Sequence, residues 1–356
     1  MIQMGRPRIH DSDQLLDAAA DIAASEGPAA LSMAGVAKAT GAPSGSVYHL
    51  FPTRATLLGE LWLRSIRAFQ SGYLEELDGE GALQLEVVNT VKSTLVPDGH
   101  PFMTGVFTPN HVECNAAELT VIGKIPEKLN GVYLRNTQNP VHQPLGKYHA
   151  FDGDGMLHLM SFSNGRCEYR NRFVPTKGFM QEQEAGGALY AGLIDNPKLA
   201  QRPGWGARGG LRDTAATDVI VHAGSALATF YQCGEPYRMD ARTLAFKGTA
   251  PWVDKVMPDG ISAHPKVDPQ TGELLFFNYA KKAPYMHFGV IDANDTLVHY
   301  VPVALPGPRL PHDMAFTKTY AILNDFPLFW DPELLALGKH KVVYRPELPS
   351  RYFGYE

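Results

Sequence analysis

The first eighty residues carry apolar positions at the spacing of amphipathic helices. One helical face collects Leu15, Leu16, Ala19, Ile22 and Ala23. Residues 11–13 offer N-cap side chains for this helix, and Gly27-Pro28 ends it. Further helices are expected around Val36, over residues 44–49 and over residues 57–69. The pattern predicts a small all-α three-helix bundle within residues 1–77, followed by a linker over residues 78–98.

Helical periodicity ends near residue 99, and short strand-like runs separated by turn residues take its place. Clear runs occupy residues 167–173, 226–231, 273–279 and 297–301. An aspartate turn that leads into a strand recurs at Asp240, Asp268 and Asp292, at intervals of 28 and then 24 residues. Such intervals are about half of a propeller blade, or slightly more. We therefore predict an antiparallel meander wound into blades, an incomplete all-β propeller over residues 99–356.

Composition adds no strong electrostatic bias to this picture. The chain has 356 residues, a formal net charge of −5 and a pI near 6.2, so any DNA contact must be local. The cysteines Cys114, Cys167 and Cys233 have no paired spacing, and the N-terminus lacks the apolar stretch of a signal peptide. No apolar run is long enough to span a membrane. We therefore expect a cytoplasmic protein with reduced thiols.

The segment from Leu31 to Arg54 reads as a helix, a tight glycine turn and a short polar helix, the layout of a helix-turn-helix DNA reader. It resembles the DNA-binding domain of TetR-type repressors at Val36-Ala37, Gly41, Gly45, Tyr48, Phe51 and Arg54. The resemblance implies that Ser44, Ser46, Tyr48 and His49 face the major groove. It also implies phosphate contacts from Ser32, Thr53 and Arg54, and an N-terminal arm with Arg6 and Arg8.

Several strings after residue 99 follow one another in the order found in a second family. They are residues 125–136, 151–158, 169–173, 215–218, 234–238, 262–266 and 306–313. Together they resemble the carotenoid cleavage oxygenases, which include apocarotenoid oxygenases, the retinal-pigment-epithelium isomerase and lignostilbene dioxygenases. The resemblance implies a seven-bladed-type propeller with one Fe(II) on its axis, held by four histidines from four blades. His264 and His312 match the first two ligands, and Glu235 matches the glutamate that orients the second.

The family resemblance also implies a reaction and its partners. It implies that dioxygen cleaves a conjugated C=C bond of an apolar substrate and leaves two carbonyl groups. Lignostilbene cleavers carry a phenol-binding tyrosine near the position of Phe173, so phenylalanine here favours a carotenoid or apocarotenoid substrate. Uptake of such a substrate implies a possible peripheral membrane contact. The family's third and fourth histidines find no counterpart, so the oxygenase-like part is expected to be C-terminally truncated.

Three interpretations of the whole chain stay open at this point. It is an iron-dependent oxygenase by family, a TetR-like DNA-binding regulator whose second part serves as a sensor, or a fusion product without function. TetR-type proteins dimerise through a helical ligand domain that this sequence does not show, and the oligomeric state stays open. The remaining histidines in the oxygenase-like part are read as structural, namely His111, His142, His149, His158, His222, His287, His299 and His340.

Overall fold

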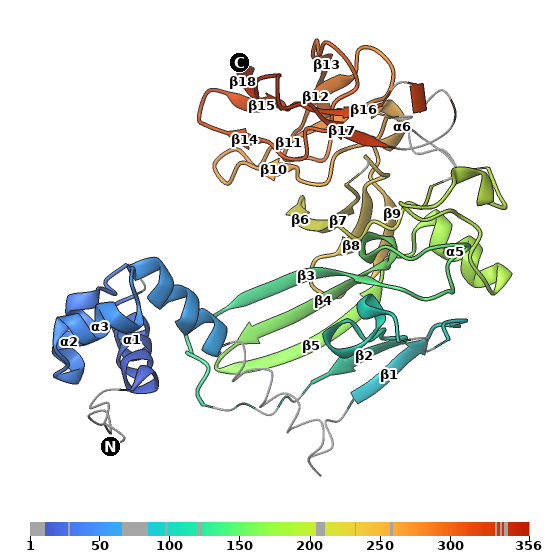
Figure 1. Ribbon diagram of the computed structural model, residues 1–356. Helices are drawn as coiled ribbons and strands as arrows, with labels where there is room; N and C mark the ends of the chain where they lie inside the picture. The colour runs from blue at the N-terminus through green and yellow to red at the C-terminus, as the bar shows by residue number, and fades with distance from the viewer. Residues whose placement is uncertain are drawn as a thin grey trace, which may run out of the picture. The chain divides into compact units, whose positions relative to one another are not determined.

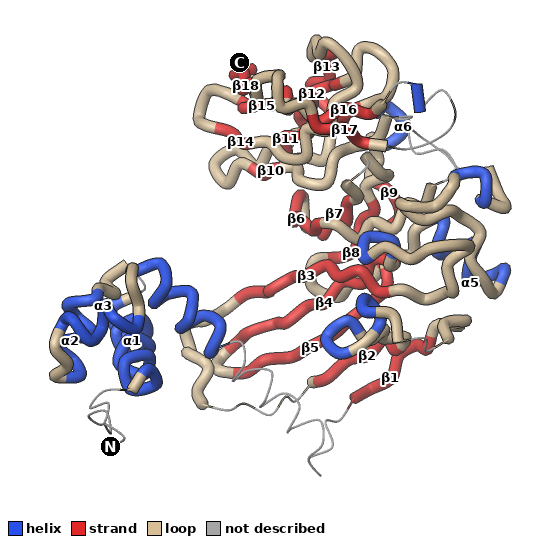
Figure 2. Tube along the Cα trace, in the orientation of Figure 1, coloured by secondary structure: helices blue, strands red, loops and turns tan. Residues whose placement is uncertain are grey.

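Figure 1 shows the chain as a computed structural model that describes residues 11–27, 29–65, 85–96, 99–117, 119, 121, 123–203, 211–231, 233–256, 259–331, 333–334, 337 and 341–355. The chain divides into two compact units, Met1–Ala82 and Leu83–Glu356. Helices dominate the described part of the first unit, whereas the second consists mainly of strands and loops (Figure 2). None of the helices described is both long and apolar enough to cross a bilayer.

The first unit is a helical bundle with capped ends. Its helices are α1 (Ser12–Glu26), α2 (Met33–Thr40), α3 (Ser44–Leu50) and a fourth helix described over residues 54–65. Asp11 caps α1 by accepting a hydrogen bond from the N–H of Asp13 at 2.6 Å. Ser32 caps α2 in the same way, from the N–H of Gly35 at 3.0 Å. Gly41 ends α2 with a φ of +68°, a left-handed conformation that glycine adopts without a steric penalty.

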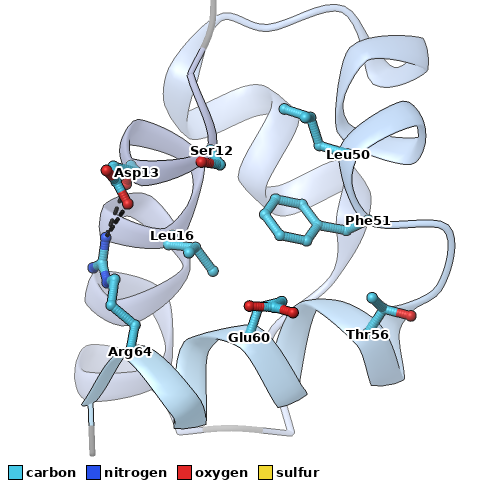
Figure 3. Close-up of a pocket in the computed structure, with 8 residues that line it drawn as sticks. All are labelled: Ser12, Asp13, Leu16, Leu50, Phe51, Thr56, Glu60 and Arg64. Carbon is cyan, nitrogen blue, oxygen red and sulfur yellow. Dashed lines mark hydrogen bonds and ion pairs between the residues drawn. The ribbon is translucent and has the colours of Figure 1, made fainter. Parts of the chain in front are cut away.

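The apolar faces expected from the sequence form the core of this bundle. Buried together are Leu15, Leu16, Ala19, Leu31, Met33, Val36, Ala37, Ala42, Val47, Phe51, Leu57 and Leu61. A shallow pocket opens between the start of α1, the end of α3 and the fourth helix (Figure 3). Arg64 closes one side of it with ion pairs to Asp17 at 2.7 Å and Asp13 at 3.9 Å. The helical fold expected for this part is confirmed.

The second unit is built from successive antiparallel sheets. The first sheet has the order β1 (Leu85–Thr90), β2 (Val112–Ala116), β5 (Arg166–Phe173), β4 (Asp154–Ser163) and β3 (Gly131–Asn139). The second is a meander of β6 (Asp218–His222), β7 (Ser225–Thr229), β8 (Tyr237–Asp240) and β9 (Phe246–Thr249). The third repeats that meander with β10 (Lys266–Val267), β11 (Leu274–Tyr279), β12 (Met286–Ile291) and β13 (Leu297–Pro302).

Smaller elements complete the second unit. The fourth sheet joins β14 (Ala315–Phe316), β15 (Ala321–Asp325) and β18 (Arg351–Tyr355), and β16 (Leu328–Trp330) pairs with β17 (Val342–Tyr344). The helices are α5 (Lys177–Ala185) and α6 (Val253–Val256), with 3₁₀ turns η1 (Pro101–Met103), η2 (Gly105–Phe107), η3 (Ala150–Asp152) and η4 (Pro197–Leu199). Two of the sheets described are four-stranded antiparallel meanders, the form of a propeller blade, and the fold class expected from the sequence is confirmed as an open series of mostly antiparallel sheets.

Aspartate turns close the hairpins within these sheets, as the sequence predicted. Asp240 ends β8 before the turn to β9, whereas Asp268 and Asp292 lie between β10 and β11 and between β12 and β13, respectively. In each turn the carboxylate accepts a hydrogen bond from the N–H two residues later, at 3.0, 2.8 and 2.9 Å. This side-chain bond adds to the backbone bonds of each turn, so the same residue type recurs where this hairpin geometry recurs.

The strand β1 is a feature that the sequence did not reveal. Residues 85–90 fall inside the expected linker, but they pair with β2 and belong to the second compact unit. All six residues are exposed, and β1 lies at the edge of its sheet. A strand without a buried face shows no alternation of apolar and polar residues, so periodicity could not identify it.

A buried ion cluster joins the first sheet to α5. The guanidinium of Arg212 donates to Asp154 on β4 and to Glu182 on α5, both at 2.8 Å, and all three side chains are almost fully buried. Burial raises the pKa of Asp154 to about 6, although Arg212 opposes that shift. A single cation therefore stabilises two carboxylates that have no access to water.

Replacing this cation should destabilise the second unit strongly. An Arg212→Met variant leaves two unpaired buried carboxylates, and we expect it to cost about 3–5 kcal/mol of unfolding free energy. Urea denaturation followed by circular dichroism measures the change. The control is Lys124→Met, which removes an exposed ion pair with Glu127 at 3.7 Å and should cost less than about 1 kcal/mol. Equal costs for the two variants would contradict this account of the cluster.

His158 on β4 makes the folded unit sensitive to acid. Its ring is hydrogen-bonded to Thr137 at 2.9 Å and to Tyr169 at 2.7 Å, consistent with the structural role expected for it. Burial, assisted by the charge of Arg135, lowers the pKa of His158 from 6.5 to about 4. Because the unfolded chain binds this proton more readily, stability is lost as the pH falls from 6.5 towards 4.

Between pH 7.5 and pH 5 this group should remove about 2 kcal/mol of unfolding free energy. A His158→Gln variant keeps hydrogen-bonding capacity but does not titrate, so its stability should fall less over the same interval. Urea denaturation of both proteins at the two pH values gives the difference. Identical pH dependence in the two proteins would show that His158 is not the responsible group.

Candidate metal centre

Three consecutive sheets each contribute one polar side chain to the same place. Asp218 is the first residue of β6, His264 lies two residues before β10, and His312 lies three residues before β14. The intervals along the chain are 46 and 48 residues, close to one sheet repeat in each case. The first strand of the second sheet, β6, lies against β3 of the first sheet and β10 of the third. The side chains that begin these sheets therefore meet in a common region.

The side chains of these three residues form a linear hydrogen-bonded series. His264 Nδ1 lies 2.8 Å from Asp218 Oδ2, and His264 Nε2 lies 3.2 Å from His312 Nε2. The two imidazole rings are nearly perpendicular, at 87°, with their centroids 4.8 Å apart. A carboxylate can only accept, so Nδ1 of His264 carries the proton and its Nε2 presents a lone pair towards His312.

The spacing of the two Nε2 atoms fits a shared metal ion. Two imidazole nitrogens that bind one ion at right angles, each at about 2.1 Å, are about 3.0 Å apart. The observed separation is 3.2 Å, and nitrogen ligands of this type suit iron, cobalt and zinc. His264 and His312 would hold the ion. Among the residues described, no group of three or more histidine, cysteine, aspartate or glutamate side chains is arranged to hold a metal.

Buried backbone fixes His264. The three residues before it, 261–263, are completely buried. The N–H of Ser262 donates to the carbonyl of Phe277 on β11 at 2.8 Å. The hydroxyl of Thr229 on β7 donates to the last carbonyl of this tripeptide at 2.6 Å. His264 therefore starts from a segment held by two different sheets, which leaves its backbone little freedom.

The segment that carries His312 is tied to the same place. Asn324 on β15 donates to the carbonyl of Asp313 at 2.6 Å, and Lys266 pairs with the Asp313 carboxylate at 2.7 Å. Partial burial opposes ionisation of Asp313, but Lys266 and the N–H of Met314 outweigh it, so the pKa of Asp313 is lowered. The ion pair links the residue after His312 to a residue two positions after His264.

The environment favours the neutral form of His312. Partial removal of the ring from water, followed by the charge of His264, lowers its pKa below 6.5. A metal binds a neutral imidazole through its unprotonated nitrogen, and the lowered pKa favours the neutral ring. Binding through Nε2 of His312 also requires the proton between the two Nε2 atoms to move to Nδ1 of His312. The residue is nevertheless exposed, so the shared point between the rings is accessible from outside the described part of the unit.

The contacts described for Glu235 and Phe173 are with residues outside the candidate site. The carboxylate of Glu235 accepts a hydrogen bond from the Tyr237 hydroxyl at 2.6 Å, and its N–H donates to Asp213 at 3.1 Å. No contact between Glu235 and His312 occurs among the described residues. Phe173 is 2% exposed and stacks on Phe179 with ring centroids 5.1 Å apart, so its side chain belongs to a packed core.

Asp218 is the residue of this site that sequence reasoning missed. It lies within one of the family-like strings, but no role was predicted for it. One signal was present: the interval from Asp218 to His264 nearly equals that from His264 to His312. A search for polar residues at the sheet repeat would have found it. The carboxylate that contacts a site imidazole is therefore Asp218, and the imidazole is that of His264.

The residues proposed to contact DNA lie on one part of the first unit. On α3, Ser44, Tyr48 and His49 are exposed and Ser46 is half-buried. Ser32 and Thr53 cap α2 and the fourth helix, with hydroxyls 3.0 and 3.1 Å from the capped N–H groups. Arg54 is exposed, and its Nε donates to the carbonyl of Leu31 at 2.7 Å. The proposed arm residues Arg6 and Arg8 lie outside the described residues, as does His340.

Each of the two units matches a known protein family. Residues 107–353 match the family of the retinal pigment epithelial membrane protein, and residues 15–61 match the bacterial regulatory proteins of the tetR family. A carotenoid 9,10(9',10')-cleavage dioxygenase from Pisum sativum is 32% identical over 72% of this chain and 50% of its own length. An isoeugenol monooxygenase from Pseudomonas nitroreducens is 33% identical over 71% of this chain and 52% of its own length.

Solved structures show the same relationship in the fold. The lignostilbene dioxygenase of Pseudomonas brassicacearum matches with a TM-score of 0.62 and 27% identity, over 71% of this chain and 56% of that protein. A cobalt-substituted form of the Synechocystis oxygenase ACO matches with a TM-score of 0.58 and 25% identity, over 69% of this chain and 54% of that protein. The chain spans about half the length of the relatives that it matches. The chain belongs to the retinal pigment epithelial membrane protein family, to which the carotenoid cleavage dioxygenases are related, and carries a tetR-family helical region before that part.

Proposed function

We propose that the second unit supplies part of an Fe(II) centre that cleaves a conjugated C=C bond with dioxygen. The observation that carries this proposal is the convergence of the His264 and His312 Nε2 atoms, 3.2 Å apart, at the starts of neighbouring sheets. Membership of the family supports the reaction class, and one of the matched structures is of a cobalt-substituted oxygenase, which supports a metal in the fold. Hydrogen bonding to Asp218 keeps the second nitrogen of His264 directed at the shared point.

The reaction balances without a further reductant. One C=C bond breaks, one O=O bond breaks, and each carbon receives one oxygen atom as a carbonyl. A ferrous ion bound at the imidazoles would supply the redox chemistry that activates dioxygen towards the alkene. The protein's own contribution is to hold two nitrogen ligands at the correct separation. It also lowers the pKa of His312, which favours the neutral ring that metal binding requires.

We propose a carotenoid-like or apocarotenoid-like substrate. Relatives named as a carotenoid cleavage dioxygenase and as an isoeugenol monooxygenase match this chain with nearly the same identity. The substrate class is therefore tested with both a carotenoid and a phenylpropene. An apolar polyene would reach the protein through peripheral contact with a membrane. Phe102 and Phe107, in η1 and η2, expose 40% and 53% of their surface and pack edge to face, which suits such a contact. Cys114, Cys167 and Cys233 are buried and reduced, which suits a reducing cytoplasm.

Metal binding tests the proposed centre directly. We expect the metal-free protein to bind Co²⁺ and to give a visible absorption band that His264→Gln and His312→Gln each abolish, because each variant removes one of the two described ligands. Anaerobic titration followed by absorption spectroscopy measures this. His299→Gln on β13 is the matched control and should leave the band unchanged. A band that survives both site substitutions, or no binding by the unsubstituted protein, would contradict the proposal.

Activity is measured separately on the iron-loaded protein. A carotenoid, an apocarotenoid and a phenylpropene are offered with dioxygen, and aldehyde products are detected by mass spectrometry. Incorporation of both atoms of ¹⁸O₂ into the two products is the expected result for the carotenoid class. Products from the phenylpropene alone would overturn the substrate class and keep the reaction type.

The tetR-family match favours a second activity, DNA binding by the first unit. Tyr48 is 53% exposed on α3, beside the exposed His49 and Ser44, and α3 follows the left-handed Gly41 turn of a helix-turn-helix arrangement. Ser32 and Thr53 expose hydroxyls at two helix N-termini, where partial positive charge favours phosphate. The charge of the whole chain is negative, so the contact must be confined to this surface.

Tyr48→Ala should reduce the affinity for an operator-like palindrome by about tenfold or more, since one well-made base or stacking contact contributes about 1–3 kcal/mol. Selection of bound fragments from a random library, followed by gel shifts at about 50 mM and about 200 mM salt, provides the measurement. Trp62→Ala, at an exposed apolar position of the fourth helix, is the control. Failure of the unsubstituted protein to shift any selected fragment at low salt would exclude DNA binding.

A further inference from the structure

Asp218, Lys266 and Asp313 lie beside the two candidate ligands but are not proposed to bind the metal. Asp218 contacts His264 at 2.8 Å, and Lys266 and Asp313 form an ion pair at 2.7 Å between the segments that carry the two histidines. We propose that these three residues are positioning residues, which set the tautomer of one imidazole and the separation of the two before any metal binds. The inference deepens the proposed metal centre and rests on it for its functional meaning.

The first step concerns the tautomer of His264. In a neutral imidazole one nitrogen donates and the other accepts, and a neighbouring group decides which is which. Asp218 offers only an acceptor, so the proton resides on Nδ1 and the lone pair of Nε2 points at His312. Without Asp218, nothing described in contact with Nδ1 would select this form. The carboxylate therefore prepares the nitrogen that a metal requires.

The second step concerns the distance between the histidines. Lys266 lies two residues after His264, and Asp313 lies one residue after His312, so their ion pair bridges the third and fourth sheets beside the imidazoles. The Asp218 contact bridges the second and third sheets in the same region. Three neighbouring sheets are thus connected by side chains at the point where their first strands begin. Loss of either link allows one sheet to shift relative to the next.

Exposure separates this role from a role in stability. The side chains of Asp218, Lys266 and Asp313 are 40%, 30% and 56% exposed. Partly exposed ion pairs contribute little to folding, typically below about 1 kcal/mol. Substitutions here should therefore leave the unfolding free energy nearly unchanged while altering the imidazoles. If these residues acted only in stability, the substitutions would lower the unfolding free energy and leave the imidazoles unchanged.

The first experiment uses metal-free, ¹⁵N-histidine-labelled protein and two-dimensional NMR, which distinguishes the protonated from the unprotonated ring nitrogen. The signals that vanish in His264→Gln identify the residue. We expect His264 to carry its proton on Nδ1 in the unsubstituted protein and to shift towards the Nε2-protonated form in Asp218→Ala. Asp268→Ala, which removes a turn aspartate of the β10–β11 hairpin, is the control and should change nothing.

The second experiment measures Co²⁺ affinity for the same proteins. Residues that orient metal ligands typically change affinity by about 10–100-fold, and this is the loss expected for Asp218→Ala. Lys266→Met and Asp313→Asn should each weaken binding, and the double variant should be no weaker than either alone, because both remove one interaction. Lys247→Met, which breaks a comparable ion pair with Asp240 at 2.9 Å in the second sheet, is the matched control.

The two measurements distinguish the inference from the function on which it rests. An Nε2-protonated His264 in the unsubstituted protein, or an unchanged tautomer in Asp218→Ala, would overturn the inference whether or not metal binds. Additive losses for Lys266→Met and Asp313→Asn would overturn the part assigned to the ion pair. Absence of Co²⁺ binding with the expected tautomer intact would overturn the metal centre and leave the positioning role of Asp218 established.

Discussion

The hydrogen bond from His264 to Asp218 is the interaction on which the candidate site depends. It joins the first strand of one sheet to the segment before the first strand of the next, and it decides which imidazole nitrogen is available. The buried residues 261–263 hold the backbone of His264, but backbone position alone would leave the ring free to choose either tautomer. Geometry and protonation state are thus set by different parts of the structure, and the site needs both.

The fold was predictable to the extent that its signals are local. Helix periodicity, caps such as Ser32 and the left-handed Gly41 act within a few residues, and the aspartate turns repeat because hairpin geometry repeats. The strand β1 was not predictable, since both of its faces are exposed and its identity depends on pairing with β2. The pairing is a tertiary contact, and the hydrophobic pattern of residues 85–90 does not indicate it.

The two candidate ligands could be chosen from the sequence, but the side chains that contact them could not. His264 and His312 were chosen by resemblance, and the structure brings their nitrogens together. The orienting carboxylate expected at Glu235 is engaged with Tyr237, while Asp218 contacts the other histidine. Short sequence motifs identify the two histidines, whereas the contacts that orient them depend on which side chains meet between sheets. In the sequence, such contacts are indicated here by intervals close to one sheet repeat.

The aspartate-closed hairpins have a consequence for how this kind of protein changes over time. Because the second and third sheets close hairpins with their own side chains, at Asp240, Asp268 and Asp292, the information that shapes these hairpins lies within the sequence of each sheet. Recombination between sheets therefore disturbs few short-range contacts. The links that such an event breaks are those between sheets, and in this chain those include the contacts that align the two imidazoles.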